Sequence, residues 1–121
     1  MARITIEGVG SFEAGRTTRL VKAIEGHGID ILHRCGGNAR CTTCRVEFIA
    51  GEPRQMTKAE HERLVAREIL GQFRLSCQIL CDHDMHVRVV NRLSATDLSD
   101  AGPEPADEIT PEPEWMERPL S

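Results

Sequence analysis

The sequence is poor in aromatic side chains: it contains three phenylalanines, one tryptophan and no tyrosine among 121 residues. So little aromatic bulk leaves a short chain with a modest core, and a bound metal or cofactor would add folding free energy that such a core does not supply. The scarcity also argues against nucleic-acid binding, which combines aromatic side chains with a strong basic patch.

Long apolar runs and a secretion signal are missing as well. No stretch approaches the roughly 20 consecutive apolar residues that span a bilayer, and the first residues do not have the pattern of a signal peptide. Five cysteines is an odd number, which disfavours a framework of disulfides. We therefore expect a cytoplasmic monomer with free thiols, no membrane partner and no nucleic-acid partner.

The net charge of −4 is unevenly distributed. Residues 94–121 hold eight acidic side chains, one arginine and five of the six prolines, whereas residues 1–93 hold 14 basic and 11 acidic side chains. The sequence therefore predicts a folded domain over 1–93 and an acidic, proline-rich tail over 94–121 that is extended or disordered. A tail that folds back would use Trp115 and Met116 as its apolar anchor; a solvated tail and a partner-binding tail are the alternatives.

The chemistry of the chain is concentrated in a loop with three cysteines, spaced C-x5-C-x2-C. A fourth cysteine lies in a later run whose alternation predicts a strand, with its thiol on the buried face. A 2Fe-2S cluster is bound by four cysteine thiolates. We therefore predict that the cluster ligands are Cys35, Cys41, Cys44 and Cys77. The fifth cysteine, Cys81, is expected to pack as a small apolar thiol.

The residues between the cysteines suit a loop wrapped around an anionic centre. Gly36 and Gly37 permit positive φ angles and a close backbone approach, so that N–H groups can point at sulfur. The hydroxyls of Thr42 and Thr43 are further candidate donors to sulfur, and donors of this kind tune the reduction potential of a cluster.

Two other metal sites are compatible with parts of the pattern. A zinc-stabilised interaction module would use the four cysteines Cys41, Cys44, Cys77 and Cys81. That interpretation leaves Cys35 and the double glycine without a role. His83 and His86 lie near the last cysteine, but the paired motifs of a Rieske centre are absent, and a polar turn explains these histidines better.

Apolar periodicity predicts an α+β fold with a mixed sheet and helices packed on it. Alternation predicts strands over residues 3–7, 11–14, 45–49, 73–79 and 85–89. A first helix is expected from a cap at Thr17 or Thr18 to about residue 25, with Leu20, Val21 and Ile24 buried. A second is expected from the capping box at Thr57 to about residue 70, with its inward side chains being Leu64, Val65 and Ile69.

Two segments carry a resemblance to a known family. The stretch from Cys35 to Cys44 and the later Arg74-Leu75-Ser76-Cys77-Gln78 resemble the 2Fe-2S ferredoxins of plant and adrenodoxin type. The five-residue gap after Cys35 is similar to the adrenodoxin-like branch, and Gly36-Gly37-x-x-Arg40-Cys41 is similar to bacterial members outside both branches. The resemblance covers residues 2 to 92.

The resemblance implies a β-grasp fold and a soluble one-electron carrier that is not itself an enzyme. Cys35 and Cys41 would hold one iron, and Cys44 and Cys77 the other. The partners would be an electron-donating reductase and an electron-accepting redox enzyme, which meet the exposed rim of residues 34–43. A sensor, or a fixed subunit of a larger oxidoreductase, stays open as an alternative.

Overall fold

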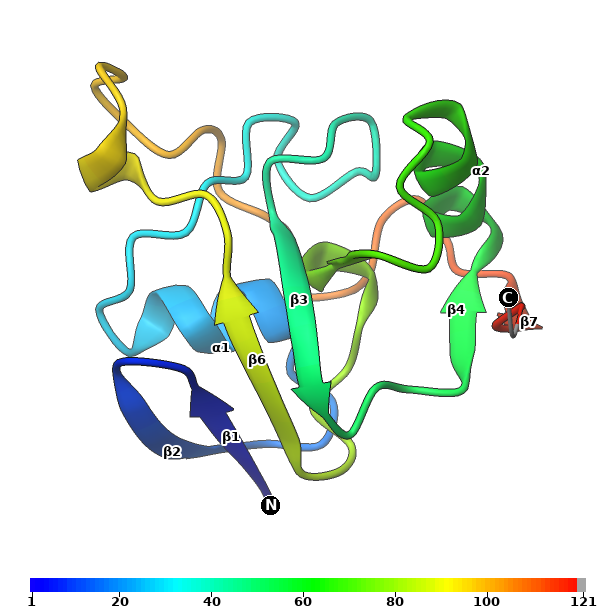
Figure 1. Ribbon diagram of the computed structural model, residues 1–121, viewed down its shortest axis with the longest axis horizontal. Helices are drawn as coiled ribbons and strands as arrows, with labels where there is room; N and C mark the ends of the chain where they lie inside the picture. Colours follow the sequence, from blue (N-terminus) through cyan, green and yellow to red (C-terminus); the bar gives the residue numbers. More distant parts are fainter. Residues whose placement is uncertain (120–121) are drawn as a thin grey trace.

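The structure of the protein, a computed structural model, describes residues 1–119, so the last two residues of the predicted tail lie outside it. A five-stranded mixed sheet in the order β2-β1-β6-β3-β5 forms its centre, and helix α1 crosses one face of that sheet (Figure 1). Its strands are β1 (Ala2–Ile6), β2 (Gly10–Ala14), β3 (Arg45–Ala50), β5 (Arg74–Leu75) and β6 (Met85–Val89). The α+β prediction is therefore confirmed.

The β1–β2 hairpin follows directly from the alternation in the sequence. Ile4 and Ile6 are buried, while the turn contains Gly8 and Gly10, both at positive φ. β1 then pairs in parallel with β6, and β6 pairs antiparallel with β3. This order places β3, which follows the cysteine loop, between β6 and β5.

Helix α1 (Leu20–Gly26) buries the predicted stripe of Leu20, Val21 and Ile24. The predicted cap is wrong, because Arg19 occupies the N-cap position and its side chain makes no capping hydrogen bond. The backbone N–H of Leu20 donates instead to the carbonyl of Ile79 at 2.8 Å, so a residue far along the chain satisfies a donor at this helix end. The Arg19 side chain is thereby left to turn into the protein.

Helix α2 (Lys58–Ala66) begins at the predicted cap, since Thr57 Oγ1 accepts from the Glu60 N–H at 3.1 Å. It ends earlier than predicted, before Glu68, which adopts a left-handed φ of 59°. Leu64 is buried as predicted, but Val65 is 50% exposed and does not face inward. Within residues 1–119, no helix is long and apolar enough to cross a membrane.

A buried ion pair joins α2 to the strand that precedes the fourth cysteine. The Glu60 carboxylate, fully buried, accepts from Arg74 Nε at 2.7 Å and from the Leu75 N–H at 2.8 Å. Glu60 therefore does not complete the capping box that the sequence predicted; its carboxylate fixes the position of β5 instead.

The strand predicted over residues 73–79 is wrong beyond Leu75. β5 has two residues and leads into the short 3-10 helix η1 (Ser76–Gln78), whose three side chains are all buried. Period-two alternation fails here because the polar side chains find partners inside the protein. Ser76 Oγ donates to the Cys44 carbonyl at 2.8 Å, and Gln78 Nε2 donates to the Thr110 carbonyl at 2.9 Å.

Over its described residues the predicted tail is extended and packs on the domain. After the 3-10 helix η2 (Leu93–Ala95) it runs past the cysteine loop to β7 (Trp115–Glu117), which pairs with β4 (Gln55–Thr57) (Figure 1). Pro105 and Ile109 are its buried side chains. Of the two anchor residues named for a tail that folds back, Met116 packs against the core, whereas Trp115 is 43% exposed.

The buried ion pair gives a test of how α2 and β5 are held. Arg74→Met leaves the buried Glu60 carboxylate without its cation and should lower the free energy of unfolding by about 3–5 kcal/mol in urea denaturation. Adding Glu60→Gln removes that unpaired charge and keeps an acceptor for the Leu75 N–H, so the double variant should be more stable than Arg74→Met alone.

Arg88 is the matched control, because it pairs with Glu47 on the surface, where both side chains are 46% exposed. Arg88→Met should cost less than about 1 kcal/mol. Equal losses for Arg74→Met and Arg88→Met would show that the buried pair does not stabilise the fold.

Candidate metal centre

The four predicted ligands lie on two segments that the fold brings together. Cys35 and Cys41 are half-buried in the loop before β3, Cys44 is buried at its end, and Cys77 is buried in η1. The Ser76 N–H and hydroxyl both donate to the Cys44 carbonyl, at 3.2 and 2.8 Å, and so fasten η1 to the end of the loop.

The thiols lie in two pairs. In the outer pair, the interaction between the two thiols lowers the pKa of Cys35 to about 4 and raises that of Cys41. In the inner pair, the interaction between the two thiols raises the pKa of Cys44 and lowers that of Cys77. One thiol in each pair is therefore stabilised as a thiolate, the form that binds metal.

Backbone N–H groups of the loop converge on the sulfur atoms. Gly36, Gly37 and Ala39 all adopt positive φ, at 74°, 82° and 56°. The tight turn that results directs the N–H of Ala39 to the sulfur of Cys77, and the N–H groups of Asn38, Arg40 and Cys41 to that of Cys35. The site is thus prepared for negative charge before any metal is considered.

The two threonines of the loop have different roles. Thr43 Oγ1 lies 3.1 Å from Cys41 Sγ, as expected of a donor to sulfur. Thr42 Oγ1 instead accepts from the Arg45 guanidinium at 2.7 Å, and this pair holds the loop at the point where β3 begins. The expectation that both hydroxyls face sulfur is correct for one of them.

Cys81 is set apart from the two pairs. Its side chain is fully buried, and burial together with the nearby Asp82 carboxylate raises its pKa to about 12. Its assignment as a non-ligand stays a prediction.

The arrangement suits a centre with more than one metal atom. Within residues 1–119, no three side chains of His, Cys, Asp or Glu are gathered around a single ion position. The two histidines near Cys81 have other partners, since His83 bonds to Asp82 and the Gly51 carbonyl and His86 bonds to Glu7. Two pairs of thiols match a cluster of two irons better than they match one zinc ion.

The tail covers one side of the cysteine loop, which the sequence did not reveal. Arg34 pairs with Asp100 at 3.2 Å, and the Thr110 hydroxyl lies 3.4 Å from the Gly37 carbonyl. A Cβ on Gly37 would lie 2.9 Å from that of Pro105 and 2.7 Å from an Arg19 nitrogen. Glycine is therefore required at position 37 both for its φ angle and for the close packing of its neighbours.

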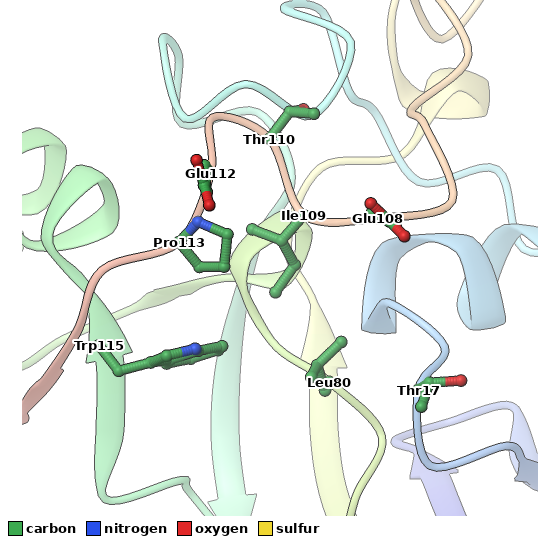
Figure 2. Close-up of a pocket in the computed structure, with 8 residues that line it drawn as sticks. All are labelled: Thr17, Leu80, Glu108, Ile109, Thr110, Glu112, Pro113 and Trp115. Carbon is green, nitrogen blue, oxygen red and sulfur yellow. The ribbon is translucent and has the colours of Figure 1, made fainter.

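A cavity of about 540 Å³ lies beneath the end of the tail, away from the thiols (Figure 2). Leu80 and Ile109 contribute apolar surface, Trp115 and Pro113 lie on the side toward β4, and Glu108 and Glu112 lie above (Figure 2). The cavity contains none of the predicted ligands. It explains why Trp115 keeps much of its surface exposed, although its strand is paired.

Comparison with known proteins agrees with this geometry. Residues 4–82 match the family model described as 2Fe-2S iron-sulfur cluster binding domain. The chain is 32% identical over 73 residues to one of the subunits of the Na(+)-translocating NADH-quinone reductase of Chlamydia felis (strain Fe/C-56). That match covers 60% of this chain and only 17% of the relative, so the chain spans less than a fifth of the relative's length.

Solved structures show the same fold. The ISC-like [2Fe-2S] ferredoxin of Pseudomonas putida JCM 20004 superposes with a TM-score of 0.59 at 23% identity, over 74% of this chain and 93% of that one. The covalent putidaredoxin reductase–putidaredoxin complex contains a chain that superposes with a TM-score of 0.53 at 25% identity, over 75% of this chain and all of that one. The expected β-grasp fold of ferredoxins is thereby confirmed.

The residues of this chain fit a 2Fe-2S cluster, the group that the matched family binds. A pair of cysteines is available for each iron, two of the four thiols are fully shielded from water, and loop N–H groups already point at sulfur. These are the features by which a protein stabilises such a cluster.

Single serine substitutions test the ligand assignment. Cys35→Ser, Cys41→Ser, Cys44→Ser and Cys77→Ser should each lose or distort the cluster, as measured by iron content and visible absorption of the purified protein. Cys81→Ser is the internal control and should keep both. If Cys81→Ser bleaches the protein while Cys35→Ser stays brown, the assignment is wrong.

Removal of the cluster tests its contribution to stability. Metal-binding free energy is folding free energy, so the apoprotein should unfold at a clearly lower temperature than the holoprotein in calorimetry. Because Ser76 still ties η1 to the Cys44 carbonyl, the loss should be concentrated in the loop and its cover, seen as faster amide exchange there. Equal midpoints for the two forms would refute this.

Proposed function

The chain belongs to the family of 2Fe-2S iron-sulfur cluster binding domains, and from this premise we propose that it is a one-electron carrier. Cys35, Cys41, Cys44 and Cys77 bind the cluster, two to each iron. When bound, a 2Fe-2S cluster takes up and releases a single electron. The observation that carries the proposal is the arrangement of the four thiols in two pairs beneath a loop whose N–H groups face sulfur.

The outer pair is the side through which electrons enter and leave. Cys35 and Cys41 are half-buried, whereas Cys44 and Cys77 are at most 1% exposed. The tail covers the glycine side of the loop, which leaves the segment around Arg40 and Thr43 as the accessible rim. A partner that docks there comes closest to the outer pair.

The charge on this rim favours an acidic partner surface. Arg40 is exposed, and Arg34 is 40% exposed beside it, although its pairing with Asp100 offsets part of its charge. Helix α2 carries both signs and provides no one-sign patch of its own. We propose that docking uses the rim of residues 34–43, with modest electrostatic steering.

Two kinds of partner are consistent with the relatives. One solved relative is a putidaredoxin bound to its reductase, which supports a freely diffusing carrier that a reductase reduces and a redox enzyme oxidises. The relative from Chlamydia felis is a much longer protein and one subunit of an NADH-quinone reductase, which supports a fixed electron-transfer module as the alternative. The carrier role is our first choice, in the cytoplasm and as a monomer.

Reductive titration of the anaerobically purified protein tests the proposal. One electron from dithionite per chain should bleach the visible absorption, and air-free addition of ferricyanide should restore it through repeated cycles. A protein that takes up no electrons, or that loses iron in the first cycle, would not be a carrier. Persistence of the free chain as a monomer during turnover with a separate reductase would favour the carrier over the fixed module.

Oxidants of opposite charge test the docking rim. The exposed arginines should make the reduced protein react faster with anionic ferricyanide, and Arg40→Glu should slow that reaction several-fold at low salt. The same variant should speed the reaction with cationic hexaamminecobalt(III).

Arg3 provides the control, because it is exposed on β1, which begins at the opposite end of the molecule from the loop (Figure 1). Arg3→Glu changes the net charge equally but should leave the ratio of the two rates nearly unchanged. Equal changes for Arg3→Glu and Arg40→Glu would place the electron-transfer rim elsewhere.

A further inference from the structure

Arg19 is a buried cation without a carboxylate partner. Its side chain is fully buried, and within residues 1–119 no carboxylate lies within 4.0 Å of its guanidinium. Arg74, the other buried arginine of the domain, is paired with Glu60. A buried charge that is not compensated costs several kcal/mol or more, and an arginine does not escape by losing its proton.

The guanidinium of Arg19 is surrounded by carbonyl groups from three segments. It donates to the Cys77 carbonyl from Nε at 3.0 Å and from an Nη nitrogen at 2.7 Å, and to the Gly37 carbonyl at 2.5 Å. The other Nη nitrogen donates to the tail carbonyls of Ala106, at 2.8 Å, and Glu108, at 3.1 Å. The forked set of donors on the Arg19 guanidinium, called the fork below, thus joins η1, the cysteine loop and the tail.

The negative charge that balances Arg19 belongs to the cysteine site. The guanidinium lies against this site, because two of its nitrogens donate to the Cys77 carbonyl. Burial lowers the pKa of Arg19, and the sulfurs of Cys77, Cys44 and Cys35 act in the opposite direction. Carbonyl dipoles solvate the guanidinium but carry no net charge. The counterion of Arg19 is therefore whatever anionic centre the cysteines hold.

We propose that Arg19 sets the reduction potential of the centre and fastens the tail over the cysteine loop. A centre that gains an electron becomes more negative, so a fixed buried cation beside it stabilises the reduced form more than the oxidised form and raises the potential. The same fork holds the Ala106 and Glu108 carbonyls, so the charge balance of the site and the closure of the tail depend on one side chain. This inference rests on the proposed cysteine ligation.

Lys22, one turn along α1, allows the two roles to be separated. Its ammonium donates to the Pro105 carbonyl at 2.9 Å and pairs with Asp107 at 3.0 Å, so it also holds the tail. Among the described residues, the polar contacts of this ammonium are all with the tail, none is with the cysteine loop or η1, and the Lys22 side chain is 22% exposed. Lys22→Gln should therefore loosen the tail without changing the potential.

The test compares full-length Arg19→Gln, Arg19→Lys and Lys22→Gln with the unaltered protein. The midpoint potential is measured by spectroelectrochemical titration, and hydrogen exchange is measured at the amides of residues 104–110. Arg19→Gln should shift the equilibrium toward the oxidised form by tenfold or more, which corresponds to about 59 mV for one electron. It should also speed exchange in the tail. Arg19→Lys keeps the positive charge but not the forked set of donors. Its midpoint potential should therefore stay close to that of the unaltered protein, while the amides of the tail should exchange faster.

Three results would overturn the inference. The first is an unchanged potential in Arg19→Gln, and the second is an equal fall in Arg19→Gln and Arg19→Lys, which would make geometry and not charge the cause. The third is tail exchange in Arg19→Gln that matches the unaltered protein. If Arg19→Gln holds no cluster while Arg19→Lys does, charge compensation is supported; if both variants fail, the fork geometry is the requirement and the electrostatic part is wrong.

The outcomes also separate this inference from the proposed function. A protein that contains no cluster even without substitution refutes the proposed function, whatever Arg19 does. A normal, reversible one-electron couple that is unaffected by Arg19→Gln refutes only the role of Arg19.

Discussion

The structure depends on holding negative charge on sulfur atoms in the interior of the protein. Little water and little aromatic bulk surround these atoms. Two of the four thiols are shielded almost completely, and an anion in such surroundings needs donors in fixed positions. The positive φ angles of Gly36, Gly37 and Ala39 supply them from the backbone. Arg19 adds a full positive charge beside Gly37 and Cys77, and the tail carbonyls fix its direction.

Much of this could be predicted from the sequence because the decisive features are local. The C-x5-C-x2-C spacing, the double glycine and the alternation of the strands are each recognised within a few residues. The strands β1, β2, β3 and β6 form close to their predicted positions. The capping threonine of α2 is likewise a local signal, since it needs only the N–H of Glu60 three residues away. The ligand set itself remains a prediction that the geometry supports.

The errors concern residues whose partners are distant in the chain. In the sequence, Ser76 and Gln78 look like the outward-facing residues of a strand. The carbonyls that accept from them inside the protein belong to Cys44 and Thr110, each 32 residues away in the sequence. Arg19 resembles a surface residue at a helix start, and nothing in its neighbourhood shows that it is buried. The burial of Pro105 and Ile109 could not be predicted from the acidic, proline-rich composition of the tail. Two apolar side chains scarcely change the average composition of a segment of that length.

The path of the tail has a consequence for the order in which the protein matures. The segment that lies over the loop emerges from the ribosome after all four cysteines, and β7 can pair with β4 only after that. Because the chain is synthesised from its N-terminus, the glycine side of the loop has no cover until the segment around Pro105 and Thr110 has been made. A cluster assembled in that interval would enter an uncovered site, whereas one assembled in the complete fold would enter a site that the segment already covers.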